Sequence, residues 1–362
     1  MKLALRDLLH NKKRYLLITV IIVLLMFMVL FLSGLVDGLG RAVCSGIDSI
    51  SGDTFLLKDD AECLITVSSV TEEQRREAET KAKGECAVLN IFRTFMQREG
   101  SSDKNDITYF AVEPDSFLSP EVYSGEKLSE SEQPGIVLAE YFEAKGVSVG
   151  DIIKDSGSGT ELKVTGFSKD RMYGHIPAGY ITYGTFTGIM EKINPGYQKK
   201  YSALVIEGEH EDIYIEGLET YTKKEIIDKL PGYQAEQMTI KLVDWLLVII
   251  TAVIIGIFFF VINIQKEKEF GVMKAIGVSM GELALFIACE VGTVALAGAL
   301  TAAGLAAAMA AALPVTMPFY LQAGSAALIL AVFVLISLAG SLFSIGRVAK
   351  IDPAGIIGGD GG

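Results

Sequence analysis

Side chains suited to catalysis or metal binding are scarce in this chain of 362 residues. Its three histidines, His10, His175 and His210, are too few and too scattered for a histidine metal cluster. No GxxxxGK(S/T) phosphate loop occurs, and the polar middle of the chain has no HExxH or paired-cysteine motif. We therefore expect that the chain is not an enzyme by itself.

The four cysteines form no metal-binding pattern. Cys44, Cys63 and Cys86 fall in the polar middle and Cys289 in an apolar stretch, without any CxxC pair. This spacing indicates neither a zinc site nor a full disulfide framework. A single bridge between Cys63 and Cys86 fits the sequence, and free, small core thiols fit it more readily.

Four apolar stretches must position these residues. They have a 1 + 3 arrangement, with one near the start of the chain and three close together near its end. Leu16–Val36 and Trp245–Gln265 contain no charged residue, Leu283–Leu313 contains only Glu290, and the fourth stretch, Ala326–Ile345, contains none. Each can cross a hydrocarbon core of about 30 Å as a helix. The first is longer than the apolar run of about 7–15 residues in a signal peptide, and no small-residue cleavage site directly follows it, so we expect a membrane helix.

Charges orient these helices. Several bases and a single acid, Asp7, precede the first stretch, and Arg347 and Lys350 follow the fourth, so both termini are expected in the cytoplasm. The short loop after the second stretch is also basic, with Lys266, Lys268 and Lys274. Residues 37–244 hold 37 of the 44 acids and 22 of the 32 bases. An acidic outer domain argues against nucleic acid as a partner, because phosphate binding needs clustered bases.

We therefore predict a membrane α-helical protein with four transmembrane helices (1 + 3) and an inserted extracellular α+β domain. Because four spans are few to enclose a solute path, a dimer about a two-fold axis is expected. The expected order is an amphipathic cytoplasmic elbow helix (1–14), transmembrane helix one (15–36), an extracellular domain with a stalk (37–240), helix two (241–265), a cytoplasmic loop (266–282), helix three (283–313), an extracellular turn (314–325), helix four (326–346) and a cytoplasmic tail (347–362).

The outer domain is expected to alternate strands and short helices. A helix at 71–83 is indicated by Thr71 and Gln74, which have the spacing of a capping box. The other expected elements are strands at 87–96, 107–112 and 202–207, a strand leading into a helix at 135–144, a hairpin of 150–154 with 161–166, and a helix that starts near Gln234.

Two features inside helix three are distinctive. Gly298, Ala302, Ala306 and Ala310 recur every four residues, a pattern that lets helices approach closely in lipid. Glu290 is the one ionisable residue within a span, where it is costly. It could snorkel to the inner surface, or face the dimer interior as a gate or proton site.

The cytoplasmic loop carries a recognisable motif. Residues 268–277, KEFGVMKAIG, resemble the coupling motif of ABC permeases of the MacB/FtsX type. The segments 5–9 (LRDLL) and 351–354 (IDPA) are similar to that family's elbow and exit tail, so the resemblance covers the whole chain. It implies a homodimer that works with two copies of a separate ABC ATPase, which binds ATP and Mg. The implied ATPase-coupling residues are Glu269, Phe270, Gly271, Met273, Lys274 and Gly277, although a plain basic turn would also explain the loop.

Three further stretches, 1–40, 232–237 (GYQAEQ) and 315–321 (VTMPFYL), are similar to the permease of Gram-positive heme exporters, the HrtB type. This resemblance implies efflux that relieves heme toxicity, with heme as transported substrate and no intrinsic cofactor. The expected location is the plasma membrane of a Gram-positive bacterium, where membrane lipid surrounds the helices.

Heme would need an apolar slot and one or two iron ligands. Because the spans lack histidine, Met, Tyr and carboxylate remain as ligands. Met28 and Glu236 are the axial candidates. The expected heme-binding set is Met28, Glu236, Tyr233, Phe27, Phe31 and Tyr173.

Ordinary structural roles also fit these residues. A methionine on a helix face usually packs, and Met26, two residues from Met28, points about 200° away from it. Glu236 could simply be an acid favoured at a helix N-terminus. Tyr173 with His175 could be a second outer heme contact or part of a loop.

Two other functions remain open. An FtsX-like mechanical regulator would use the same motor to control a cell-wall hydrolase through the outer domain. A MacB-like exporter would carry antimicrobial peptides or lipids in place of heme.

Overall fold

The computed structural model describes residues 6–7, 10–100 and 103–349. Its contacts divide the chain into a helical unit (Met1–Gly38, Thr239–Leu313 and Phe319–Gly362) and a β-rich unit (Leu39–Met238 with Pro314–Pro318). Much of the expected elbow at 1–14, and the tail segment 351–354, lie outside the described residues.

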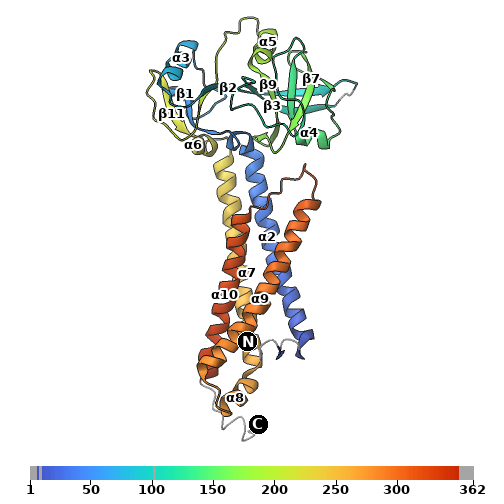
Figure 1. The fold of residues 1–362 in the computed structure, drawn as a ribbon, viewed down its shortest axis with the longest axis vertical. Coiled ribbons are helices and arrows are strands. Elements are labelled where there is room, and N and C mark those ends of the chain that lie inside the picture. The colour runs from blue at the N-terminus through green and yellow to red at the C-terminus, as the bar shows by residue number, and fades with distance from the viewer. Residues whose placement is uncertain (1–5, 8–9, 101–102, 350–362) are drawn as a thin grey trace. The chain divides into compact units, whose positions relative to one another are not determined.

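Among the described residues, four helices are long and apolar enough to cross a membrane, as the sequence predicted. The helices are α2 (Lys12–Asp48), α7 (Tyr233–Gln265), α9 (Met280–Ala312) and α10 (Ala323–Ala349) (Figure 1). Both α2 and α7 continue beyond the expected spans 15–36 and 241–265, and their outer ends belong to the β-rich unit. A short helix, α8 (Glu267–Ala275), occupies the loop before α9.

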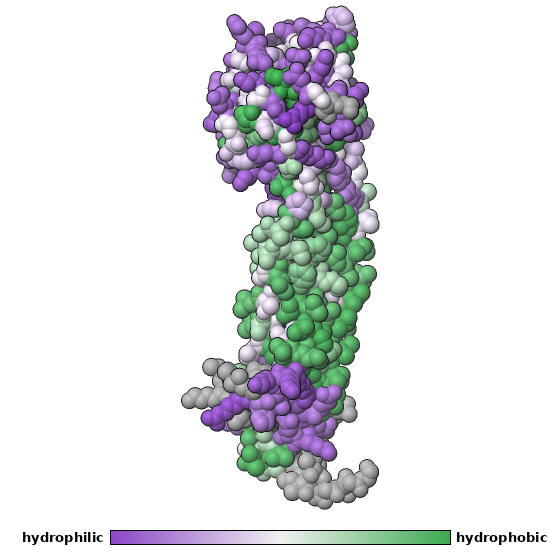
Figure 2. All heavy atoms as spheres, turned by 90° about the vertical axis from the view of Figure 1, so that its right-hand side faces the viewer, coloured by the Kyte–Doolittle hydropathy of each residue, from purple (hydrophilic) through white to green (hydrophobic). Residues whose placement is uncertain are grey.

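An apolar core holds the helical unit together. Met26, Ile255, Ile287 and Phe333 come from four different helices, and each is at most 1% exposed. The opposite faces are also apolar, with Leu300 72% exposed. Figure 2 shows hydrophobic side chains over much of the helical unit and hydrophilic ones over the β-rich unit. Exposed leucines of this kind suit contact with lipid.

Close helix contacts occur where small residues lie. Ala302 and Ala306 are fully buried in the core of the helical unit. A Cβ on Gly298 would come within 2.7 Å of the Ile22 side chain. A second close approach, which the four-residue pattern did not indicate, brings Gly340 of α10 against the backbone of Gly256 in α7.

One sheet forms the centre of the β-rich unit. Its strand order is β11-β1-β10-β2-β3-β9-β5-β7-β4, with β6 beside β2 and β7 and with β8 beside β9. The long strand β2 joins two parts of it, because its first residues pair with β10 and its last with β3 and β6. The strands are β1 (Gly52–Lys58), β2 (Cys86–Arg98), β3 (Lys104–Val112), β4 (Ser124–Gly125), β5 (Gly135–Ala139), β6 (Ile152–Asp155), β7 (Glu161–Ser168), β8 (Met172–Tyr173), β9 (Ile176–Thr182), β10 (Ala203–Glu207) and β11 (Leu218–Thr222).

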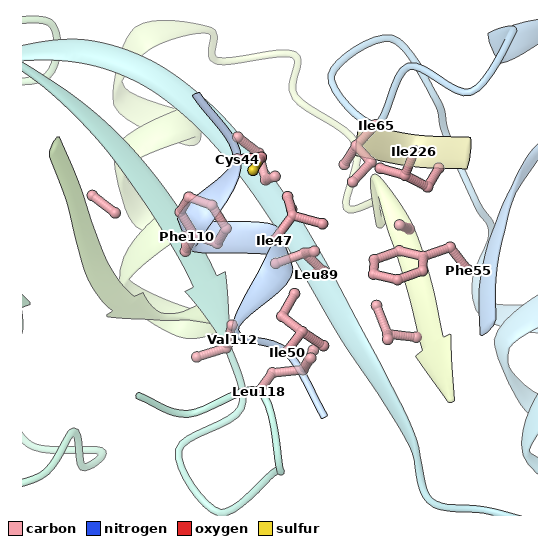
Figure 3. Packing of buried hydrophobic residues seen from close by; sticks show 14 of the residues in the cluster. Cys44, Ile47, Ile50, Phe55, Ile65, Leu89, Phe110, Val112, Leu118 and Ile226 are labelled. Atoms are coloured by element: carbon pink, nitrogen blue, oxygen red, sulfur yellow. The ribbon is translucent and has the colours of Figure 1, made fainter. Parts of the chain in front are cut away.

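Short helices flank this sheet, and the outer end of α2 packs into one of its cores. The helices are η1 (Asp59–Ala61), α3 (Glu72–Lys81), α4 (Glu140–Ala144), α5 (Tyr183–Ile193) and α6 (Lys223–Asp228). Figure 3 shows Cys44 and Ile47 of α2 among Leu89, Phe110 and other buried side chains of the strands. This burial fixes the outer end of α2 within the β-rich unit.

The structure confirms the local sequence predictions for the outer domain. Thr71 caps α3 through a capping box with Gln74. The hairpin of β6 and β7, the β5–α4 pair and strands β2, β3 and β10 lie where expected. The strands β1, β9 and β11 and the helices α5 and α6 were not anticipated. All four cysteines are free, which favours the core-thiol interpretation over a bridge.

Candidate functional site

The candidate residues on α2 differ sharply in burial. Met28 is 41% exposed, whereas Met26 is completely buried in the core of the helical unit. The rings of Phe27 and Phe31 stack with centroids 6.0 Å apart, and Phe319 lies 5.5 Å from Phe31. This face of α2 therefore offers a thioether beside aromatic rings, and Met26 has a packing role.

A tight hairpin carries Tyr173 and His175. The backbone φ is +57° at Gly174 and +64° at His175, as in the two-residue turns that join antiparallel strands. The Gly174 and His175 N–H groups donate to the carbonyls of Val43 and Ala42, both at 2.9 Å. The turn between β8 and β9 is thus fastened to the outer end of α2.

This turn brings His175 against Glu236. The His175 Nε2 atom lies 3.2 Å from Glu236 Oε2, in the first turn of α7. The Glu236 side chain is 29% exposed, so an exogenous ligand could still reach its carboxylate. The sequence singled out both residues but not their pairing, because a contact across 61 positions leaves no local pattern.

The two candidate tyrosines pack against the β-rich core. Tyr173 meets Phe110 edge to face at 5.8 Å, and burial raises the pKa of Tyr173 to about 12. Its phenol therefore keeps its proton at neutral pH, which disfavours a phenolate ligand at this position. Tyr233 is partly buried beside the same core.

Met28 lies in the helical unit, and Glu236, Tyr233, Tyr173 and His175 lie in the β-rich unit. Within the β-rich unit the structure brings His175 and Glu236 together. Joint ligation of one iron by Met28 and Glu236 stays a prediction.

The loop helix α8 divides the candidate coupling residues into two groups. Phe270 and Gly271 are buried and Met273 packs on the core, whereas Glu269 and Gly277 are exposed and Lys274 is half-buried. Gly271 lies within α8, and Gly277 follows its C-cap with φ +94°.

Sequence reasoning missed two exposed apolar side chains of this loop. Val272 is 51% exposed and Ile276 is 76% exposed. With Glu269, they give α8 and its C-cap a mixed apolar and acidic surface suited to a protein partner. Their alternation with the buried Phe270 and Met273 at helical spacing is the signal that could have revealed them.

Glu290 does not snorkel to the surface. It is 3% exposed, and its carboxylate accepts hydrogen bonds from Lys266 Nζ. Lys266 is itself 1% exposed, so this lysine of the basic loop is buried.

Several known proteins are similar in sequence to this chain. Residues 242–353 match the FtsX-like permease C-terminal family model. A permease of Staphylococcus haemolyticus is 28% identical over 99% of both chains, and one of Staphylococcus epidermidis is 29% identical over 99% of both chains. Both carry the provisional name hemin transport system permease protein HrtB. The periplasmic region of MacB from Actinobacillus actinomycetemcomitans is similar to 50% of this chain and 93% of that region, with a TM-score of 0.36 and 10% identity.

Residues 242–353 of the chain therefore resemble an FtsX-like permease C-terminal domain, and four helices among its described residues are long and apolar enough to cross a membrane. The chain is similar over nearly its whole length to permeases named for hemin transport.

Proposed function

We propose that this permease extrudes heme from the membrane, driven by a separate ATPase that docks on α8. The observation that carries the proposal is the similarity over 99% of the chain to permeases named for hemin transport. The exposed Met28 with its neighbouring aromatic rings supplies the kind of surface that a flat, apolar porphyrin would contact.

Weak ligands suit an efflux pump. A thioether from Met28 and a carboxylate from Glu236 bind iron less firmly than two imidazoles would, so the substrate can leave once the site closes. In this proposal His175 holds the Glu236 carboxylate in place before heme arrives. A homodimer would present two such sets of residues.

The proposed ligands can be tested by absorbance. Full-length protein purified with its ATPase and loaded with hemin should show a Soret band that shifts in Met28→Ala and in Glu236→Ala. Met309→Ala is the matched control, because Met309 is also exposed (37%) but lies on α9. Spectra unaltered in both ligand variants would rule out these ligands, and unchanged growth on heme after deletion of the permease would rule out the substrate.

The match to the FtsX-like family favours a second candidate, a mechanical regulator of a cell-wall hydrolase. That function predicts a protein partner on the β-rich unit and ATP hydrolysis that hemin does not stimulate. A MacB-like exporter would instead be stimulated by a peptide or lipid. Measuring hydrolysis with each compound separates the three.

A further inference from the structure

A buried cluster of charged side chains lies where α7 passes into α8. Lys266 Nζ donates hydrogen bonds to both Glu290 oxygens, at 2.8 and 2.9 Å, and to Asp7 Oδ2 at 2.6 Å. It also lies 3.0 Å from the Tyr15 hydroxyl, which in turn donates to Asp7. The donors of the ammonium group are thus satisfied inside the protein, as a buried charge requires.

Aromatic rings enclose the same ammonium. The centroids of Phe286, Tyr15 and Phe270 lie 5.4, 5.7 and 5.8 Å from Lys266 Nζ. Rings at this distance attract a cation through their electron-rich faces, more strongly where water is excluded. Carboxylates and rings together hold the ammonium in one position.

The partners come from different segments of the helical unit. Lys266 is the N-cap residue of α8, Glu290 lies in α9, and Tyr15 lies at the inner end of α2. Asp7 precedes α2, and Arg14 Nη2 donates to Gln265 Oε1 at 2.8 Å beside the cluster. One side chain therefore joins the start of α8 to α9, to α2 and to the segment before it.

Stability alone does not account for this arrangement. Apolar side chains of similar volume often replace a buried ion pair without loss of stability. Hydrogen bonds add directional links, because the ammonium cannot leave one partner without being left buried and poorly paired. Segments joined in this way are expected to move together rather than slide past one another.

We infer that Lys266 is a positioning residue. Its hydrogen bonds with Glu290 and Asp7, which we call the latch, make α8, α9 and the inner end of α2 move as one body. The inference rests on the proposed function only in taking α8 as the surface on which an ATPase acts. A push on α8 would then reach two membrane helices directly, in addition to α7.

Hydrogen exchange of the full-length chain tests the latch without any substrate. In Lys266→Met we expect faster exchange of the amides of α8, whereas Lys266→Arg should keep most of the protection. Lys241→Met is the matched control, because Lys241 is an exposed lysine of α7, the helix that ends just before Lys266. Protection of α8 unchanged in both Lys266→Met and Glu290→Gln would overturn the latch.

Stimulation of ATP hydrolysis by hemin distinguishes a latch that transmits motion from an ion pair that only stabilises the fold. The double variant Lys266→Met with Glu290→Gln removes both charges of the buried pair, and Asp7, whose side chain is 20% exposed, keeps hydrogen bonds from Asn11 and Tyr15. In complex with the ATPase, this variant should hydrolyse ATP at the basal rate but lose most of the stimulation by hemin. Full stimulation in a folded double variant would overturn the inference, and the double variant also serves if Lys266→Met alone fails to fold.

Failure of the proposed function would look different. If hemin does not stimulate hydrolysis by the wild-type complex, heme efflux is wrong, while the exchange of α8 amides still decides whether the latch exists.

Discussion

Burial sets the chemistry of single side chains in the β-rich unit, and Cys86 is the clearest case. Burial, with the nearby Glu79 carboxylate, raises the pKa of the Cys86 thiol to about 12. Its thiolate, the reactive form, is then about one part in ten thousand at pH 8.

We expect iodoacetamide at pH 8 to alkylate Cys86 far more slowly than an exposed thiol. Tyr214→Cys supplies the comparison, because residue 214 is 81% exposed in the same unit. Peptide mass spectrometry over a time course measures both rates in one molecule. Equal rates would mean that Cys86 is open to solvent.

The same shift predicts a pH dependence of stability. Because the folded chain holds the Cys86 proton more tightly than the unfolded chain, the free energy of unfolding should fall as pH rises above about 8.5. Denaturant midpoints measured between pH 8 and 10 test this. In Cys86→Ala the fall should be smaller, and an identical slope in both proteins would contradict the assignment.

At the scale of elements, α3 begins with a complete capping box. The Thr71 hydroxyl accepts from the Gln74 N–H, and the Gln74 side chain accepts from the Thr71 N–H at 3.0 Å. Thr71→Ala should cost about 0.5–2 kcal/mol of stability, because it leaves a helix N–H without its partner.

Thr80→Ala is the control for this change. Thr80 is an exposed residue of the same helix, whose hydroxyl bonds only to the Arg76 carbonyl one turn earlier. Alanine should be neutral or slightly stabilising there. Local exchange of the α3 amides measures both variants, and equal protection would contradict the role of the cap.

The contact between α7 and α10 depends on two glycines. A Cβ on Gly340 would lie 2.9 Å from the Gly256 Cα and 3.0 Å from its carbonyl oxygen, and backbone atoms cannot move aside as side chains do. Gly340→Ala should lower stability by about 1–3 kcal/mol, as overpacking does.

Gly304→Ala provides the matched change, since a Cβ at Gly304 of α9 meets nothing within 4 Å. Alanine favours a helix, so this variant should be at least as stable as the wild type. Thermal unfolding of the full chain in detergent compares the two. Equal melting temperatures would show that the helices can separate at no cost.

The sequence predicts features that depend on residues close together along the chain better than contacts between distant residues. The capping box at Thr71 and the apolar spans are local patterns, and both predictions were confirmed. Strand β9 was missed because it is buried on both faces and contains proline and glycine, so its residues show no alternation. The pairs His175–Glu236 and Lys266–Glu290 join residues distant in sequence, so only the fold reveals them.

At the scale of the whole molecule, charge follows the division into units. Residues 37–244 carry a net charge of about −15, and the rest of the chain carries about +3. The two contributions sum to the net charge of −12. By the positive-inside rule, we expect the basic segments on the cytoplasmic side and the acidic domain outside. Lys266 is buried, but Lys12, Lys13 and Lys268 are exposed and keep the surface at this end of the helices basic.

The predicted orientation can be tested with single cysteines at two exposed positions. Tyr214→Cys places a thiol on the β-rich unit, and Ile276→Cys places one just after α8, at a residue that is 76% exposed. If both termini are cytoplasmic, a membrane-impermeant maleimide should label position 214 on intact cells and position 276 only after permeabilisation. The wild-type chain reports any labelling of the native thiols, of which Cys44 and Cys63 are buried. Labelling of position 276 on intact cells would reverse the orientation and remove α8 as a docking surface for a cytoplasmic ATPase.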